Sequence, residues 1–166
     1  HNVASYCVGD VTKSADTKKY VAATIEKFGC IDILLANAGI EGAVGPLADY
    51  DEDEFDRVMA VNVKGVWLGL KHIFPEMEKN GGGSIVITSS VAGVMGTPLL
   101  SAYGTSKHAV IGLMRAAAKE GGAHKIRVNT VNPSPVEGQM MRRIETGISP
   151  EDGEVIHDAF KAEIPL

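Results

Sequence analysis

The chain has 166 residues, of which 45% are hydrophobic and 22% are charged, and its formal net charge is -5 at pH 7. This length and apolar content suffice for one domain with a core of ordinary size, and they argue against a disordered chain. The acidic balance and the scattered lysines and arginines argue against a nucleic-acid partner, which selects a basic surface.

The apolar stretches and the cysteines bear on where the protein works. No apolar run reaches the roughly 18 residues that a membrane helix needs, and no charged segment is followed by a signal-peptide core. Cys7 and Cys30 lack the spacing of a metal site and lie in apolar stretches, where a reduced thiol behaves as a small hydrophobic group. We therefore predict a soluble, cytoplasmic protein with no metal site and no membrane partner.

The first part of the chain alternates short apolar runs with a helical pattern. Residues 3–11 form an apolar run that ends in Asp, as in a buried strand of a parallel sheet. Residues 14–29 combine a possible cap at Ser14, apolar positions at helical spacing and a terminal glycine. Residues 30–39 repeat the strand pattern, so the order predicted here is strand, helix, strand.

The alternation continues through the rest of the chain. A long helix is predicted over residues 51–79, and a strand over 84–90 follows three glycines. A helix over 102–121 precedes a strand over 125–133 that a proline ends. Residues 135–163 are expected to form a loop with one or two short helices.

This order of elements defines the predicted fold class, which is α/β. Alternating strands and helices form right-handed β-α-β units, which build a doubly wound parallel sheet with helices on both faces. We expect residues 1–166 to belong to a single domain of this kind. Ligands of such sheets bind beyond the carboxyl ends of the strands. The residues at these ends are Asp10, Asn37 to Gly39, Ser89, Ser90 and the segment 132–136.

Tyr103 and Lys107 form the first candidate for chemistry. They lie four positions apart in "SAYGTSKHA", residues 101–109, and therefore on one face of the predicted helix. A phenol has a pKa near 10, which is high for a base at neutral pH, and a neighbouring ammonium favours the phenolate. The pair could exchange a proton with an alcohol or carbonyl oxygen, although such pairs also occur by chance on helix surfaces.

Two further polar residues strengthen this candidate. Ser90 ends the preceding strand, where its hydroxyl could bond the same substrate oxygen. Asn62 lies inside the long helix, where asparagine has poor propensity and usually has a structural or functional reason. A water site and a bend in the helix are equally good explanations of Asn62.

Six motifs lie in order along the chain, and together they identify a family. They are "DVT" at 10–12, "ANAG" at 36–39, "VNVKG" around Asn62, "TSSVAG" around Ser90, "YGTSK" at 103–107 and "VNPSPV" from residue 131. The ordered set resembles the short-chain dehydrogenase/reductase family over essentially the whole chain. The resemblance implies a Rossmann-like domain and an NAD(P)-dependent oxidoreductase that interconverts a secondary alcohol and a ketone.

The resemblance also implies roles for the catalytic residues. Tyr103 would be the general acid and base, and Lys107 would lower its pKa and bind the nicotinamide ribose. Ser90 would orient and polarise the substrate oxygen. Asn62 would hold the water of a proton relay that reaches Lys107.

The cofactor residues implied by the resemblance lie at the strand ends. Asp10 and Val11 would contact the adenine, and the backbone of Asn37, Ala38 and Gly39 would line the adenosine side. The nicotinamide would be covered by the loop that contains Pro133, Ser134 and Val136. Ser134 and Gly138 depart from the residues that the family commonly has in this loop.

The motifs leave several properties open. No glycine-rich phosphate turn precedes Asp10, so we expect a domain that is incomplete at both ends, and the choice between NAD and NADP cannot be made. Substrate candidates are a 3-oxoacyl thioester and a polyol, sugar or cyclic alcohol. A non-catalytic dinucleotide sensor or scaffold and an inactive fragment are the alternatives.

Surface features suggest further contacts. The helices over 51–79 and 102–121 have apolar positions on more than one side, and the equivalent helices of the family join subunits, so a homotetramer is expected. Arg142 and Arg143 could meet an anionic substrate or simply face solvent.

Overall fold

Three parallel strands form the centre of the structure, a computed structural model that describes residues 4–162 and residue 164. The strands are β1 (Ile33–Ala36), β2 (Gly83–Thr88) and β3 (Ile126–Val131). They lie in the order β1-β2-β3, with Ile33 beside Ser84 and Ile85 beside Val128. The three strands therefore end at one edge of the sheet, as predicted for a parallel sheet.

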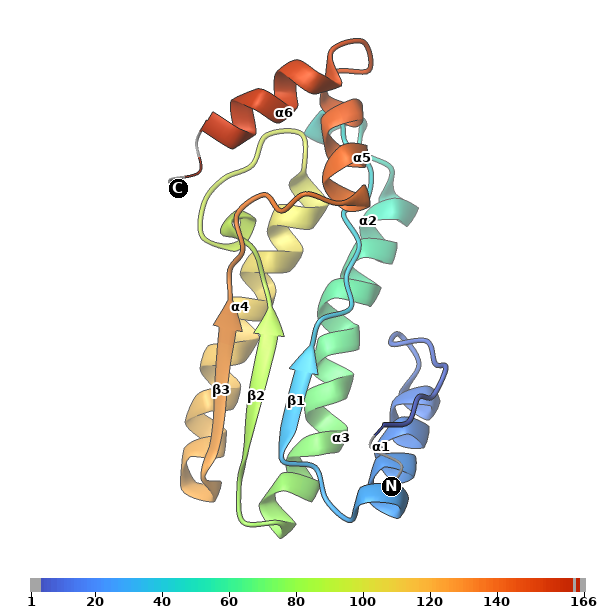
Figure 1. Cartoon of the computed structure of the whole chain (residues 1–166), viewed down its shortest axis with the longest axis vertical. Coiled ribbons are helices and arrows are strands. Elements are labelled where there is room, and N and C mark those ends of the chain that lie inside the picture. The colour runs from blue at the N-terminus through green and yellow to red at the C-terminus, as the bar shows by residue number, and fades with distance from the viewer. Residues whose placement is uncertain (1–3, 163, 165–166) are drawn as a thin grey trace.

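Helices precede, connect and follow these strands. They are α1 (Ser14–Phe28), α2 (Glu52–Met59), α3 (Gly65–Lys79), α4 (Ser101–Gly121), α5 (Gln139–Ile148) and α6 (Gly153–Ala162). Figure 1 shows α3 and α4 lying along the sheet and α5 and α6 gathered beyond the carboxyl ends of the strands. The predicted α/β alternation of parallel strands and helices is confirmed.

The described helices cover one face of the sheet. Both crossovers, β1 to β2 and β2 to β3, run in the same direction across the sheet, so right-handed connections place α3 and α4 on the same side. The core between them includes Ile85, Ile87 and Val128. On the opposite face Ile33 and Leu35 are exposed. A second helical layer was also expected, and the described residues do not supply it.

The strand predicted over residues 3–11 is not formed in the described part of that segment, which begins at residue 4. Residues 4–10 are irregular, and the side chains of Tyr6 and Val8 are 93% and 83% exposed. In the doubly wound order 3-2-1-4-5-6, two strands separate the third strand from the fourth. A segment in the place of the third strand therefore has no neighbour in the sheet described here.

The helix predicted over residues 51–79 is one continuous helical stretch with a change of pitch. It contains α2, a π turn at Ala60–Lys64 and α3, and Asn62 lies in the π turn. The side chain of Asp51 caps the first turn by accepting a hydrogen bond from Glu54 N at 2.8 Å. Single π turns inside α-helices are frequent at functional sites.

The cap predicted for α1 is wrong. Lys13 occupies the N-cap position, without a side-chain cap. Ser14 lies inside the helix, and its hydroxyl bonds His72 Nε2 on α3 at 2.9 Å. A contact between helices therefore uses the hydroxyl that local sequence assigned to a cap.

Across the described residues, none of the helices combines the length and apolar character that crossing a membrane requires.

Candidate active site

A cavity of about 390 Å³ lies at the carboxyl ends of the strands, below α5 and α6. Its walls come from the strand ends, from α4 and from the segment that leads into α5. This cavity is lined by residues predicted for catalysis, Ser90, Tyr103 and Lys107, and for the nicotinamide, Pro133, Ser134 and Val136. Asn37 and Gly39, which were predicted for the adenosine side, line it too.

Lys107 is held at the base of this cavity. Its ammonium lies 5.4 Å from the centre of the Tyr103 ring, and it donates a hydrogen bond to the Thr88 carbonyl oxygen at 2.8 Å. Lys107 is 5% exposed. Loss of solvation disfavours the ammonium and lowers the pKa of Lys107 to about 8.

The pKa of Tyr103 is raised, although the sequence predicted that Lys107 would lower it. Burial of the phenol is the largest cause, and the negative charge of Glu41 acts in the same direction. The side-chain hydrogen bond with Ser90 acts against both. Desolvation disfavours charge on the phenol and on the ammonium alike, so placing these two groups in one buried site does not by itself lower the pKa of Tyr103.

Two consecutive serines, Ser89 and Ser90, follow β2 and have different surroundings. Ser90 begins a short turn, Val91–Gly93, where its hydroxyl accepts a hydrogen bond from Ala92 N at 3.2 Å. Ser89 is buried and donates to the Lys107 carbonyl oxygen at 2.9 Å. Ser89 thus fastens the strand end to α4, and Ser90 offers its hydroxyl beside Tyr103.

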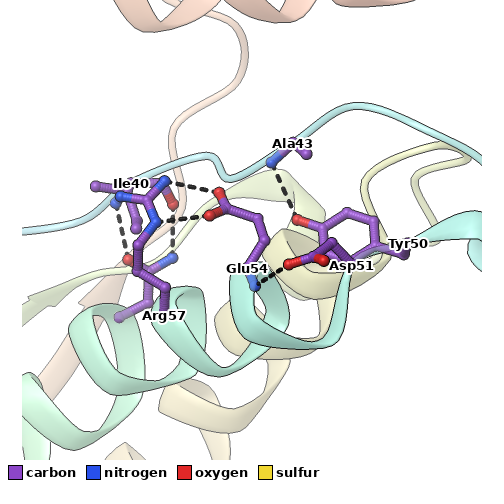
Figure 2. Close-up of polar contacts among 7 residues, drawn as sticks. Ile40, Ala43, Tyr50, Asp51, Glu54 and Arg57 are labelled. Atoms are coloured by element: carbon purple, nitrogen blue, oxygen red, sulfur yellow. Dashed lines mark hydrogen bonds and ion pairs between the residues drawn. The ribbon is translucent and has the colours of Figure 1, made fainter.

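Asn62 fastens the loop after β1. Its Oδ1 accepts a hydrogen bond from Ile40 N at 2.8 Å, and its Nδ2 donates to the Ile40 carbonyl oxygen at 2.8 Å. The same Nδ2 donates to Ser106 Oγ at 3.0 Å. Figure 2 draws the two bonds at Ile40 above the π turn. The structure therefore gives the buried amide a positioning function, and the predicted water relay stays a prediction.

Gly39 leaves room for the catalytic groups. A Cβ at this position would lie 3.3 Å from Asn62 Oδ1 and 3.5 Å from Lys107 Nζ. The first distance is tight and the second is an ordinary contact, so a side chain here would press on Asn62 and touch Lys107. The glycine of the "ANAG" motif thus brings the strand end against Asn62 and Lys107.

A second cavity, of about 230 Å³, is lined by Val11, Asn37 and Ala38. Asn37 lines both cavities, so residues predicted for the two ends of the cofactor lie on either side of the end of β1. The hydrogen-bonding side chains of Ser90, Tyr103 and Lys107 and the two adjoining cavities fit a long polar ligand such as NAD(P). Asp10 is not among the residues that line either one; its carboxylate accepts from Thr12 N at 2.9 Å and Thr12 Oγ1 at 2.7 Å.

Sequence reasoning missed Glu41. Its carboxylate is 9% exposed and accepts a hydrogen bond from Nε of Arg143, which lies on α5. Arg142 instead pairs with Glu137 at 3.1 Å, with both side chains exposed. Neither arginine lines the larger cavity. The Arg143 side chain is 60% exposed, so the pair is buried only at its Glu41 end. The two partners are 102 positions apart, so no local pattern could have indicated the pair.

The chain is similar to known oxidoreductases. Residues 1–149 match the sequence profile of the short chain dehydrogenases. The chain is 39% identical over 145 residues to levodione reductase of Leifsonia aquatica, covering 87% of this chain and 54% of that protein. It is 40% identical over 151 residues to 2,5-dichloro-2,5-cyclohexadiene-1,4-diol dehydrogenase of Sphingobium indicum, covering 89% of this chain and 60% of that protein.

A solved structure also resembles the chain. The crystal structure of NAD+-bound xylitol dehydrogenase superimposes with a TM-score of 0.89 at 35% identity, and the match covers 96% of this chain and 64% of that one. In each of these three comparisons the chain spans less than two thirds of the other protein.

Proposed function

Because this chain belongs to the short-chain dehydrogenase family, we propose that the complete protein is an NAD(P)-dependent oxidoreductase that interconverts a secondary alcohol and a ketone. The observation that carries this proposal is the convergence of Ser90, Tyr103 and Lys107 on one cavity. A lysine as buried as Lys107 is rare, and a buried ionisable group beside a half-buried phenol in a cavity is typical of functional sites.

Bound NAD(P) supplies the nicotinamide that accepts or donates the hydride. Reduction of a ketone leaves negative charge on its oxygen, and the Tyr103 hydroxyl gives that oxygen a proton. The Ser90 hydroxyl donates a hydrogen bond where this charge develops. In alcohol oxidation Tyr103 takes the proton back, and the Ser90 hydrogen bond, which acts to lower the pKa of Tyr103, supports the phenolate that does so.

The proposed cofactor site runs across the end of β1. Val11, Asn37 and Ala38 contact the adenosine side, supported by the smaller cavity that they line. Gly39, Lys107 and the loop of Pro133, Ser134 and Val136 contact the nicotinamide side, supported by the larger one. Asp10 contacts the adenine from the turn that its carboxylate forms with Thr12. NAD and NADP both remain candidates.

We assign the substrate to the class of compact, uncharged cyclic alcohols and ketones. The walls of the larger cavity beyond Tyr103 are apolar, and they come from Leu100, Met140, Met141, Ile144 and Phe160. Lys107 is the sole charged side chain among the described lining residues. A ring of the kind printed in the name of the cyclohexadienediol dehydrogenase suits such walls better than a phosphate or a carboxylate does.

Assembly and location remain predictions for the complete protein. A groove between α3 and α4 is lined by Trp67, Phe74 and Leu113, and Trp67 is exposed. An exposed aromatic beside a groove of this kind supports the predicted homotetramer. The cytoplasmic location rests on the sequence alone.

The test uses the complete protein with NAD+ or NADP+ and cyclohexanol or an acyclic polyol as the alcohol. We expect reduction of one cofactor, measured by absorbance, with a higher kcat/KM for the cyclic alcohol. Tyr103→Phe should bind the cofactor and turn over neither alcohol. Turnover by that variant at the unmodified rate would rule out Tyr103 as the acid and base, and no turnover of either alcohol by the unmodified protein would overturn the proposed substrate class.

A further inference from the structure

The loop that follows β1 is fixed on both sides of Glu41. Ile40 exchanges two hydrogen bonds with Asn62, each at 2.8 Å, and Ala43 N donates to the Tyr50 hydroxyl at 3.0 Å. Gly42 has a φ of +74°, and a Cβ there would lie 2.6 Å from both Tyr50 Oη and a methyl of Val58. Figure 2 shows the hydrogen bonds of Ile40 and the separate bond between Ala43 and Tyr50, which hold this loop above α2. The backbone that carries Glu41 is therefore rigid before any substrate arrives.

The Glu41 carboxylate requires a partner. It is 9% exposed, and burying a carboxylate without compensation is costly. Arg143 supplies the compensation by donating from Nε, and its guanidinium lowers the pKa of Glu41 against the effect of burial. Arg57 adds a second positive charge from α2, where it also pairs with Glu54 at 2.6 Å.

The same loop and α5 meet at a second point. A Cβ on Gly147 would lie 2.7 Å from the Val44 side chain, so the helix approaches the loop closely there. Between these two contacts α5 carries Ile144, which lines the larger cavity, and its first turn carries Met140 and Met141, which line it too. The position of these three side chains thus depends on how α5 is held against residues 41–44.

We propose that the ion pair between Glu41 and Arg143 is a latch that holds α5 closed over the substrate cavity, which makes Glu41 and Arg143 positioning residues of the reaction. With the latch formed, the apolar side chains of α5 form one wall of the site. With either partner removed, α5 keeps the Val44 contact and the bond of Glu145 to His157 on α6, but it loses its charged contact with the loop after β1 and the wall is looser. The kinetic consequence of this inference rests on the proposed function, whereas the closure itself does not.

Glu41 has a second link to the site, because its charge reaches Tyr103. The charged and titratable groups around these two residues are Arg143 on α5, Arg57 on α2 and Lys107 on α4. Glu41 raises the pKa of Tyr103, so removing the carboxylate should lower it. Removing Arg143 instead leaves the carboxylate without its counter-charge, so the pKa of Tyr103 should be higher in Arg143→Gln than in Glu41→Gln, in which α5 is loosened as well. Loosening of α5 alone would not produce this difference between the two variants.

The experiment compares Glu41→Gln, Arg143→Gln and Arg143→Lys in the complete protein, with Arg142→Gln as the matched control. Arg142 neighbours Arg143 on the same helix, and its pair with Glu137 is exposed. Hydrogen exchange of residues 139–148 measures the closure of α5 without any substrate. We expect faster exchange in the two glutamine variants, a smaller change in Arg143→Lys, and none in the control.

The kinetic measurement uses cyclohexanol as the probe. We expect KM to rise about tenfold in both glutamine variants while kcat changes little, since about 1.4 kcal/mol of positioning corresponds to that factor. The pH midpoint of alcohol oxidation should be lower in Glu41→Gln than in Arg143→Gln. The latch is refuted if exchange of residues 139–148 in both glutamine variants equals that of Arg142→Gln. If hydrogen exchange differs between the variants as expected but the unmodified protein turns over no alcohol, the latch stands and the proposed function is overturned instead.

Discussion

Asn62 in the π turn and Ile40 in the loop after β1 satisfy each other's polar groups. Both bonds are 2.8 Å long, and the amide of Asn62 is almost fully buried. A backbone N–H and a backbone carbonyl of the loop are thus paired by one side chain of the π turn. The residue that occurs in the "VNVKG" motif is therefore also the residue that builds the loop on which Glu41 lies.

The first prediction concerns this pairing. Asn62→Leu keeps the volume of the side chain but leaves the Ile40 groups without partners, and each unsatisfied buried group costs about 1 to 3 kcal/mol. We expect the free energy of unfolding to fall by about 2 to 4 kcal/mol in urea titrations. Asn80→Ala is the control, because the Asn80 side chain bonds Asp32 at an exposed position and its loss should cost under about 1 kcal/mol. Equal losses of unfolding free energy in the two variants would show that the pairing of Asn62 with Ile40 stabilises the fold no more than an exposed hydrogen bond does.

The second prediction separates the two serines at the end of β2. Ser90→Ala removes a hydroxyl beside Tyr103, so kcat/KM for ketone reduction should fall about 10²- to 10³-fold with little change in stability. Ser89→Ala removes the bond to the Lys107 carbonyl oxygen, so it should mainly lower the free energy of unfolding, by about 1 kcal/mol. Steady-state kinetics and urea unfolding of both variants test this division. The reverse pattern would exchange the roles of the two hydroxyls.

Much of this arrangement could be predicted from the sequence. Short apolar runs that alternate with helical patterns indicated β1, β2, β3 and the helices between them, because burial on a sheet and helical periodicity leave different spacings. Since parallel strands end at one edge, the same reasoning brought Ser90 and Pro133 to one place. The larger cavity is lined by residues that were selected in this way.

Three features could not be predicted, and each depends on a distant group. Residues 4–10 match a strand in composition, but a strand needs a neighbour in the sheet, which composition does not specify. Ser14 has the sequence of a cap, and His72 on another helix competes for its hydroxyl. The raised pKa of Tyr103 depends on burial and on Glu41, which lies 62 positions earlier in the chain.

The third prediction concerns the titration of Lys107. Its pKa is about 8 in the folded protein against an ordinary value of 10.5, so between these values the unfolded chain binds a proton that the native state has lost. The free energy of unfolding therefore rises with pH through this window, by at most about 3 kcal/mol, and gains nothing from Lys107 below it. Urea titrations at pH 7 and pH 10 of the cofactor-free protein and of Lys107→Met measure the difference. If the lysine carries the effect, the variant shows a smaller rise, and an equal rise in both proteins would assign it to other groups.

The last prediction compares two glycines near the site that have opposite surroundings. A Cβ on Gly93 would lie 2.5 Å from Ser89 Oγ and 2.8 Å from the Lys107 carbonyl oxygen, the two atoms that join the end of β2 to α4. Gly93→Ala must push these elements apart, and we expect it to cost about 1 to 3 kcal/mol of stability.

Gly112 is the matched control, because it lies within α4 and a Cβ there would have no atom within 4 Å. Gly112→Ala should stabilise the helix by about 0.5 to 1 kcal/mol, since alanine loses less backbone freedom on folding. Thermal unfolding of the two variants gives shifts of opposite sign if the close approach at Gly93 is what requires a glycine. A rise in Tm for Gly93→Ala would mean that the turn after β2 can move away from α4, and Ser90 would then lack the rigid support that the proposed chemistry needs.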